Sequence, residues 1–302
     1  MTRAFLVALA LLCGLACQAA VPVGAPDLAG TLLFASDRSG VDALYMRKLP
    51  GDRDLRLSYL VEPVKDPALA PDAEHGAFAV GGRIAVVTLA TSDVRYLSLG
   101  QEFRDAAPAW YPDGKRLVIT SRRTEGDSAD LYELALEGAG VLSPRRRLTE
   151  TPADESEPAV SPDGASVVFV REDSLHRLDL ADGRVRKLTA GFRKTRQPRF
   201  LPGGRILCLW NEGKRYGIDL IDGDGRNRET LSEGSTYYRN VSPSPDGRYL
   251  IATFTFDLGF RPAEVLTRRR NEELRLLDAR GRFLRSLSEG WRSSSHSATW
   301  GR

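Results

Sequence analysis

Three histidines and one acidic turn are the residues of this chain best suited to metal chemistry. His75, His176 and His296 could each offer an imidazole nitrogen, but they occupy different positions of a repeating pattern, so we do not expect them to converge. The segment Asp222-Gly-Asp-Gly225 has oxygen donors that suit calcium, but it lacks the rest of a ligand loop and predicts a plain turn. A Gly-x-Ser-x-Gly nucleophile motif does not occur in the sequence. We therefore expect no metal, no cofactor and no catalytic residues.

The first 20 residues are predicted to be a secretory signal. Arg3 supplies the positive end, and the apolar stretch 4–15 is too short for an ordinary membrane span. Two outcomes are open. Gln18-Ala-Ala20 offers small residues for cleavage and soluble export, whereas Leu15-Ala16-Cys17 partly resembles a bacterial lipoprotein signal, in which Cys17 would be lipidated. The protein is thus expected in the periplasm, or anchored to the outer membrane if Cys17 carries lipid.

Composition narrows the class of partner. The chain has 302 residues, of which 42% are hydrophobic, and this is enough to bury a large core. Its 43 basic and 40 acidic residues nearly balance, so no strong field for polyanions arises and nucleic acid is not an expected partner. Cys208 is the one cysteine outside the signal, within an apolar strand-like run, and we expect a buried structural thiol and no internal disulfide.

The elements that must position any site come from a repeat. In the clearest copy, residues 107–121, Pro112-Asp-Gly114 is a turn, because Pro presets φ and Gly accepts positive φ. A short strand precedes this turn, and an apolar strand, a polar loop and two more strands follow it. Each copy is therefore predicted to be a four-stranded meander. Five copies begin near positions 66, 108, 157, 197 and 240.

Two incomplete copies complement each other. Residues 31–58 contain strands two to four without a first strand, and Ser297-Ala-Thr-Trp300 resembles a first strand with nothing after it. Joining them gives a sixth unit and closes a ring without exposed sheet edges. A frayed tail at 297–302 is the alternative. We therefore predict an all-β fold, a six-bladed β-propeller over residues 30–302, after a linker at 21–29.

The repeats resemble a known family. Pro108-Ala-Trp-Tyr-Pro-Asp-Gly114 to Ser121, Pro158 to Phe169, Ser244-Pro-Asp-Gly247 and Phe34-Ala-Ser-Asp-Arg-Ser-Gly40 are similar to the propeller repeats of TolB-like periplasmic proteins. This resemblance implies a propeller, but it says little about activity, because similar repeats occur beside hydrolase domains and in some sugar-acid lyases. The resemblance also suggests a place in a cell-envelope complex, but the family's full role there is not expected to carry over to this chain.

Meander geometry predicts where a binding surface would form. Loops between second and third strands should share one face of the disc with the connections into each next first strand, so distant residues meet there. Arginine and tyrosine are favoured at binding hot spots. The residues that we expect on this face as binding candidates are Arg38, Arg122, Arg171, Arg196, Tyr238, Arg239 and His296.

Two further segments carry clustered arginines. The insertion Asp257–Arg270 is expected to project from the same face, as a lid, a partner contact or an ordinary loop. Arg145-Arg-Arg147 leads into a fourth strand at the outer edge, and we expect a solvated surface there.

Two function classes stay open. The first, which we prefer, is a monomeric, non-enzymatic exported scaffold that binds a protein or glycan partner in the envelope. The second is a carbohydrate-active lyase or hydrolase that uses converging loop residues in the central pocket.

Overall fold

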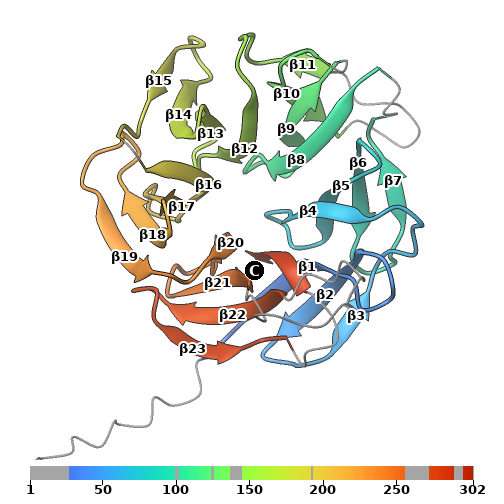
Figure 1. The fold of residues 1–302 in the computed structure, drawn as a ribbon. Helices are drawn as coiled ribbons and strands as arrows, with labels where there is room; N and C mark the ends of the chain where they lie inside the picture. Colours follow the sequence, from blue (N-terminus) through green and yellow to red (C-terminus); the bar gives the residue numbers. More distant parts are fainter. Residues whose placement is uncertain are drawn as a thin grey trace, which may run out of the picture.

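The structure is a computed structural model that describes residues 27–98, 102–123, 126–136, 145–191, 193–255, 272–288 and 295–301. The chain forms six four-stranded antiparallel sheets arranged as blades around a central axis (Figure 1). The predicted six-bladed β-propeller is confirmed. Among the described residues, no helix is long and apolar enough to cross a bilayer.

The blades follow one another along the chain, and in each the first strand lies innermost. Blade 1 contains β4 (Val64–Leu69), β5 (His75–Val80), β6 (Arg83–Thr88) and β7 (Val94–Tyr96). Blade 2 contains β8 (Arg104–Trp110), β9 (Arg116–Arg122), β10 (Asp130–Ala135) and β11 (Arg145–Arg147). Blade 3 contains β12 (Glu155–Val160), β13 (Ser166–Arg171), β14 (Ser174–Asp179) and β15 (Val185–Lys187). Blade 4 contains β16 (Lys194–Phe200), β17 (Ile206–Glu212), β18 (Arg215–Ile221) and β19 (Glu229–Gly234). Blade 5 contains β20 (Tyr238–Pro243), β21 (Tyr249–Thr255), β22 (Glu272–Asp278) and β23 (Phe283–Ser286). Blade 6 contains β24 (Ser295–Gly301), β1 (Gly30–Ser36), β2 (Ala43–Leu49) and β3 (Asp54–Arg56).

Blade 6 joins the two ends of the chain. Strand β24 pairs with β1 in antiparallel register, with Thr31 opposite Gly301. The C-terminal strand therefore supplies the missing first strand, as the sequence predicted, and residues 297–301 are not a frayed tail. Figure 1 shows this strand in red beside the blue β1.

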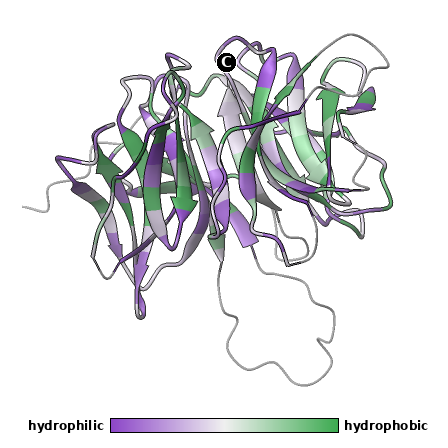
Figure 2. Cartoon of the chain, turned by 90° about the horizontal axis from the view of Figure 1, so that it is seen from above, coloured by the Kyte–Doolittle hydropathy of each residue, from purple (hydrophilic) through white to green (hydrophobic). Residues whose placement is uncertain are grey.

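The core lies between neighbouring blades. Second strands are buried on both faces, and Phe78 and Phe169 are fully buried. Burying a side chain of this size contributes about 1.5–3 kcal/mol. Trp110 packs against blade 1 in the same cluster as Ala77, and its indole nitrogen donates to the Ala68 carbonyl at 3.0 Å. Figure 2 shows the blades side by side, with hydrophobic residues along their strands.

The two faces of the disc have different connections. Four backbone hydrogen bonds tie the residue just before the third strand of one blade to the start of the next blade's first strand. The donor–acceptor pairs are Val64 to Asp42, Asp105 to Gly82, Glu155 to Ala129 and Thr195 to Asp173. These loops and connections form one surface, which we call the loop face. The opposite surface, the turn face, carries the Pro-Asp-Gly turns, in which Gly114 adopts a φ of 65°.

The Arg145–Arg147 segment corrects one expectation. Arg146 and Arg147 are exposed, as expected for the outer edge, but Arg145 points inward. Its guanidinium bonds both oxygens of the fully buried Asp105 carboxylate at 2.9 Å and lies 3.9 Å from the centre of the Phe103 ring. The buried carboxylate of the first strand needs a cation, and the fourth strand supplies it.

Candidate ligand-binding channel

The innermost strands are kinked where they line the axis. Each contains or faces a register shift, and five of them place a non-glycine residue at positive φ at that point. These residues are Asp66 (49°), Ala107 (49°), Glu157 (55°), Gln197 (52°) and Ser297 (52°). Four of the five precede a proline, which cannot donate to a ladder and is tolerated at bulges. Such residues cost on the order of 1–3 kcal/mol each and often cluster at ligand sites.

The bulged residues connect one blade to the next. Glu157 of blade 3 accepts two bonds from Gln197 of blade 4, from the backbone N–H at 2.7 Å and from Nε2 at 2.9 Å. Gln197 Oε1 accepts in turn from Nδ2 of Asn240 in blade 5 at 3.0 Å. The side chains around the axis are therefore fixed in place before any ligand arrives, which lowers the entropic cost of binding.

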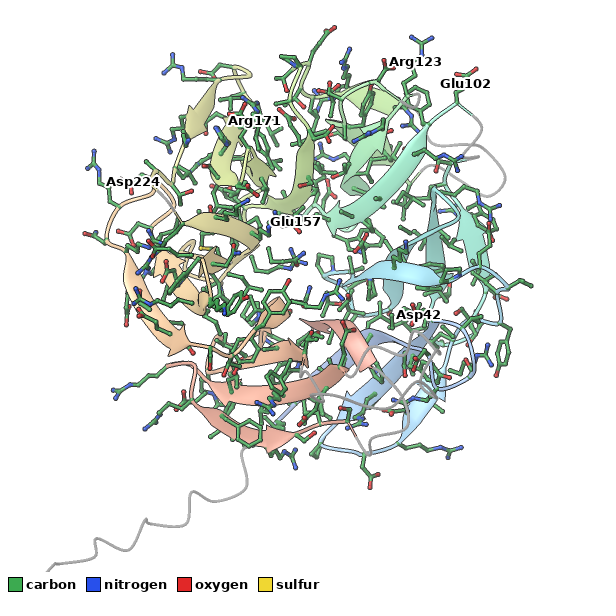
Figure 3. All side chains as sticks on the ribbon, in the orientation of Figure 1. Asp42, Glu102, Arg123, Glu157, Arg171 and Asp224 are labelled. Atoms are coloured by element: carbon green, nitrogen blue, oxygen red, sulfur yellow. The ribbon has the colours of Figure 1, made fainter. Side chains whose placement is uncertain are left out.

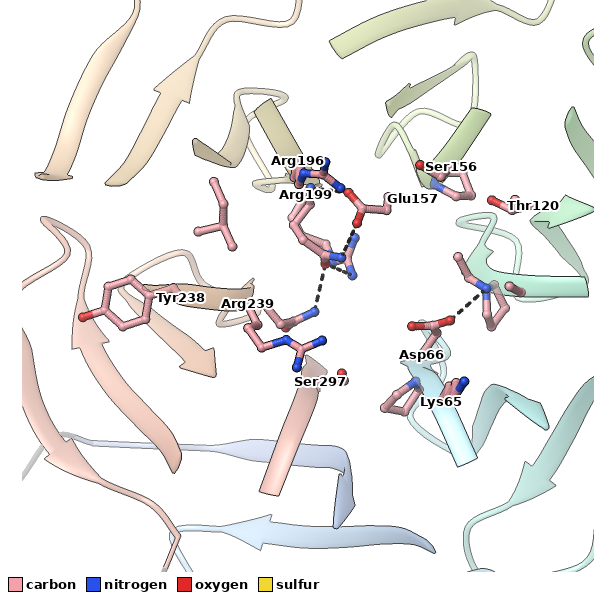
Figure 4. Close-up of a pocket in the computed structure, with 18 of the residues that line it drawn as sticks. Lys65, Asp66, Thr120, Ser156, Glu157, Arg196, Arg199, Tyr238, Arg239 and Ser297 are labelled. Atoms are coloured by element: carbon pink, nitrogen blue, oxygen red, sulfur yellow. Dashed lines mark hydrogen bonds between the residues drawn. The ribbon is translucent and has the colours of Figure 1, made fainter. Parts of the chain in front are cut away.

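These strands enclose a cavity of about 580 Å³, within the range of ligand pockets (Figure 4). Figure 3 shows the labelled Glu157 beside the axis, whereas Arg123 and Asp224 lie at the rim. Trp210, Tyr237 and Tyr238 give the cavity an aromatic wall. Its charged lining is mixed in sign: Lys65, Lys194, Arg196, Arg199 and Arg239 are basic, and Asp42, Asp66, Glu157 and Glu272 are acidic.

Arg199 is one of the lining residues that the sequence did not predict. Its guanidinium donates to the Pro198 carbonyl at 2.9 Å and to Gln197 Oε1 at 3.3 Å, and among the described residues no carboxylate lies within ion-pair distance of it. Removal from bulk water lowers the pKa of Arg199, while the charges of Glu157 and Asp66 act in the opposite direction.

A signal for Arg199 was available in the repeats. In blades 1 to 3, alanine follows the proline of the first strand, as Ala68, Ala109 and Ala159, whereas blade 4 has Arg199 there. These four residues hold the same position, because each is the first to pair with the second strand after the bulge. Because alanine is sufficient for packing at this position in three blades, a large cation there indicates a role other than building the blade.

Three predicted site residues meet in this cavity: Arg196, Tyr238 and Arg239 (Figure 4). Arg196 pairs with Asp173 at 2.7 Å, and Arg239 pairs with the buried Glu272 at 2.7 Å. Tyr238 is buried, and burial raises the pKa of its hydroxyl.

The other predicted residues are absent from this cavity lining. Arg38 pairs with Asp54 at 2.5 Å, Arg122 with Asp154 at 2.8 Å, and Arg171 with the fully buried Glu155 at 2.6 Å. The Arg122 and Arg171 pairs join two segments of the loop face, whereas the Arg38 pair reaches the start of β3. The His296 side chain, Cys17 and the insertion 257–270 lie outside the part of the chain that the structure describes.

Apolar side chains on the loop face were also missed. Tyr59 is 76% exposed and Val61 is 90% exposed, both in the connection from β3 to β4, and Tyr237 at the cavity is 43% exposed. The sequence signal was weak, because single apolar residues in loops are common. All three precede a first strand on the loop face, so they are candidates for contact with a binding partner.

The histidines do not converge among the described residues. His75 begins β5, and its Nδ1 lies 2.9 Å from Asp72 on the turn face, with Glu74 close enough to complete a cluster of three donors. This cluster is largely exposed and lies on the opposite face from the loop face. His176 is buried in β14 beside the Phe169 ring at 5.8 Å, and burial lowers its pKa.

The chain is similar to known proteins in both sequence and fold. Residues 79–301 match the family described as "TolB beta propeller domain". The chain is 29% identical over 161 residues to a protein TolB homolog of Chlorobium luteolum, covering 51% of this chain and 35% of that protein. It is 33% identical over 115 residues to the uncharacterized peptidase YuxL of Bacillus subtilis, covering 35% of this chain and 17% of that protein. The chain thus spans about a third or less of these relatives.

A solved structure of TolB from Acinetobacter baumannii superimposes with a TM-score of 0.73 and 18% identity, covering 90% of this chain and 66% of that one. At this identity the likeness concerns the fold alone.

Proposed function

Because the chain belongs to the TolB β-propeller domain family, we propose that it is an exported binding scaffold that holds a protein or glycan partner of the cell envelope. The partner docks on the loop face and reaches into the channel. The scaffold binds its partner and catalyses no reaction. It acts as a monomer in the periplasm or at the outer membrane.

The observation that carries this proposal is the exposed apolar surface of the loop face. Tyr59, Val61 and Tyr237 present apolar area to solvent near the starts of first strands, and Tyr237 borders the cavity. Apolar and aromatic groups beside arginine are typical of residues that dominate binding energy. Most of the neighbouring arginines already hold carboxylates, so the apolar groups supply the contact area and the ion pairs keep the face rigid.

The ion pairs also limit what the face can bind. A ligand that engages Arg239 must do so together with Glu272, and one that engages Arg196 must share it with Asp173. Such paired charges favour a partner with complementary polar groups over a simple polyanion.

The test is affinity capture from an envelope extract with matched variants. A Tyr59→Asp, Val61→Asp double variant should lose capture of the partner at least tenfold. Phe283→Asp, a change at a 54% exposed residue of outer strand β23, should capture the same partner as the unaltered protein. Equal capture by all three proteins would refute docking on the loop face, and turnover of a sugar acid by the purified protein would favour the enzyme alternative.

A further inference from the structure

Arg199 places inside the channel a cation that no carboxylate of the described residues pairs with. Its position faces the cavity, its two hydrogen bonds go to neutral oxygens, and the described residues provide no carboxylate in contact with it. The other basic lining residues of blades 4 and 5, Lys194, Arg196 and Arg239, each form an ion pair. A partly desolvated guanidinium without a counter-charge gains strongly from a carboxylate, because charge-assisted bonds are about twice as strong as neutral ones.

Asn240 adds a second unsatisfied group at the same place. It is 7% exposed, and its Oδ1 receives no hydrogen bond from the residues that the structure describes, while its Nδ2 donates to Gln197 Oε1 at 3.0 Å. The same Gln197 oxygen accepts from Arg199 at 3.3 Å, so the two side chains are neighbours through one shared atom. A buried acceptor without a donor costs about 1–3 kcal/mol, which a ligand N–H would recover.

The surrounding charges select among carboxylate ligands. Glu157 and Asp66 act on Arg199 through space, and one oxygen of Asp66 bonds the Ala107 N–H at 3.3 Å while the other has no bond among the described residues. These carboxylates would repel a second and third anionic group, so an acidic polysaccharide fits poorly. A peptide presents one carboxylate next to backbone N–H donors and fits the mixed lining.

We propose that Arg199 and Asn240 form a subsite for a single Asp or Glu side chain of a bound peptide. The guanidinium binds the carboxylate, and Asn240 Oδ1 accepts an adjacent peptide N–H. This proposal rests on the proposed binding function and identifies the class of its partner as protein.

The experiment uses the capped peptide acetyl-Gly-Glu-Gly-amide and its neutral counterpart acetyl-Gly-Gln-Gly-amide, titrated into the full-length protein at low salt. The Glu peptide should bind at least tenfold more tightly than the Gln peptide. Arg199→Ala should abolish this preference, and it should fold, because alanine occupies the same position in three blades. Arg199→Lys should keep part of the preference, since Lys retains the charge without the bidentate geometry. Arg226→Ala, which removes an equal charge from an exposed turn-face residue, should bind like the unaltered protein.

Each contrary result has a definite meaning. Equal Kd values for Arg199→Ala and the unaltered protein, or no binding of the Glu peptide up to about 10 mM, would overturn the subsite. Tighter binding of trigalacturonate than of the Glu peptide would overturn the assignment to protein. If Arg199→Ala still captures the envelope partner while the loop-face double variant does not, the proposed function stands and the subsite fails.

Discussion

The indole nitrogen of Trp300 donates a hydrogen bond to the carbonyl oxygen of Ala29, 271 residues earlier in the chain, at a distance of 3.0 Å. This bond and the β1–β24 ladder hold the ring closed.

Trp300→Ala should lower the free energy of unfolding by about 3–5 kcal/mol. The Trp300 side chain is only 8% exposed, and its removal would leave a cavity between blades 5 and 6. Deleting residues 298–302 should cost more, because β1 would lose most of its pairing with the inner strand β24 and keep only its pairing with β2. Chemical denaturation measures both. A melting temperature unchanged by the deletion would mean that closure contributes nothing.

Asp105→Ala should destabilise the protein by about 3–5 kcal/mol, because it leaves the Arg145 guanidinium without its buried partner. The matched control is Asp182→Ala, which breaks an exposed pair with Arg184 at 3.8 Å and should change stability by less than about 1 kcal/mol. Similar losses for the two variants in urea unfolding would contradict this account.

Acid should weaken the Pro-Asp-Gly turns. A bond from the Ser244 hydroxyl, aided by the Arg248 N–H and side chain, lowers the pKa of Asp246 to about 2. A folded pKa below the unfolded value of about 4 means that this contribution is complete above pH 4 and disappears as the pH falls toward 2. Asp246→Asn should therefore reduce the pH dependence of stability between pH 4 and 2. Identical slopes in pH-dependent unfolding would rule this out.

Cys208 should resist thiol reagents in the folded protein. Burial raises the pKa of its thiol to about 12, so almost no thiolate forms at pH 8. In a Cys13→Ser, Cys17→Ser protein, maleimide should label Cys208 only in denaturant. Rapid labelling of the native protein, with an unchanged melting temperature, would indicate an accessible thiol.

The fold was predictable because short local sequence motifs mark each repeat. Each Pro-Asp-Gly turn sets the spacing of two strands, and the complementary fragments at the two ends indicated closure. Alternation along a strand would also predict which side chains face the axis if the strands were regular. They are not: the bulge at Gln197 adds a residue, which shifts the side-chain alternation where Arg199 meets the channel.

Ion pairing was the part of the site least visible in the sequence. Arg38, Arg122 and Arg171 are similar to Arg199 as residue types, but the first three have carboxylate partners that come from loops and neighbouring strands. Partner identity depends on tertiary contacts over separations of 16 to 32 residues. Composition alone does not distinguish a paired arginine from an unpaired one.

The shared sixth blade also sets an order on folding during synthesis. Strand β1 is among the first parts of the propeller to leave the ribosome, and its inner partner β24 is the last. Until then the β1 edge stays open, and the final contact must close a loop of more than 250 residues, which is slow. The ring of blades therefore cannot close before β24 has been synthesised, however early the other blades form.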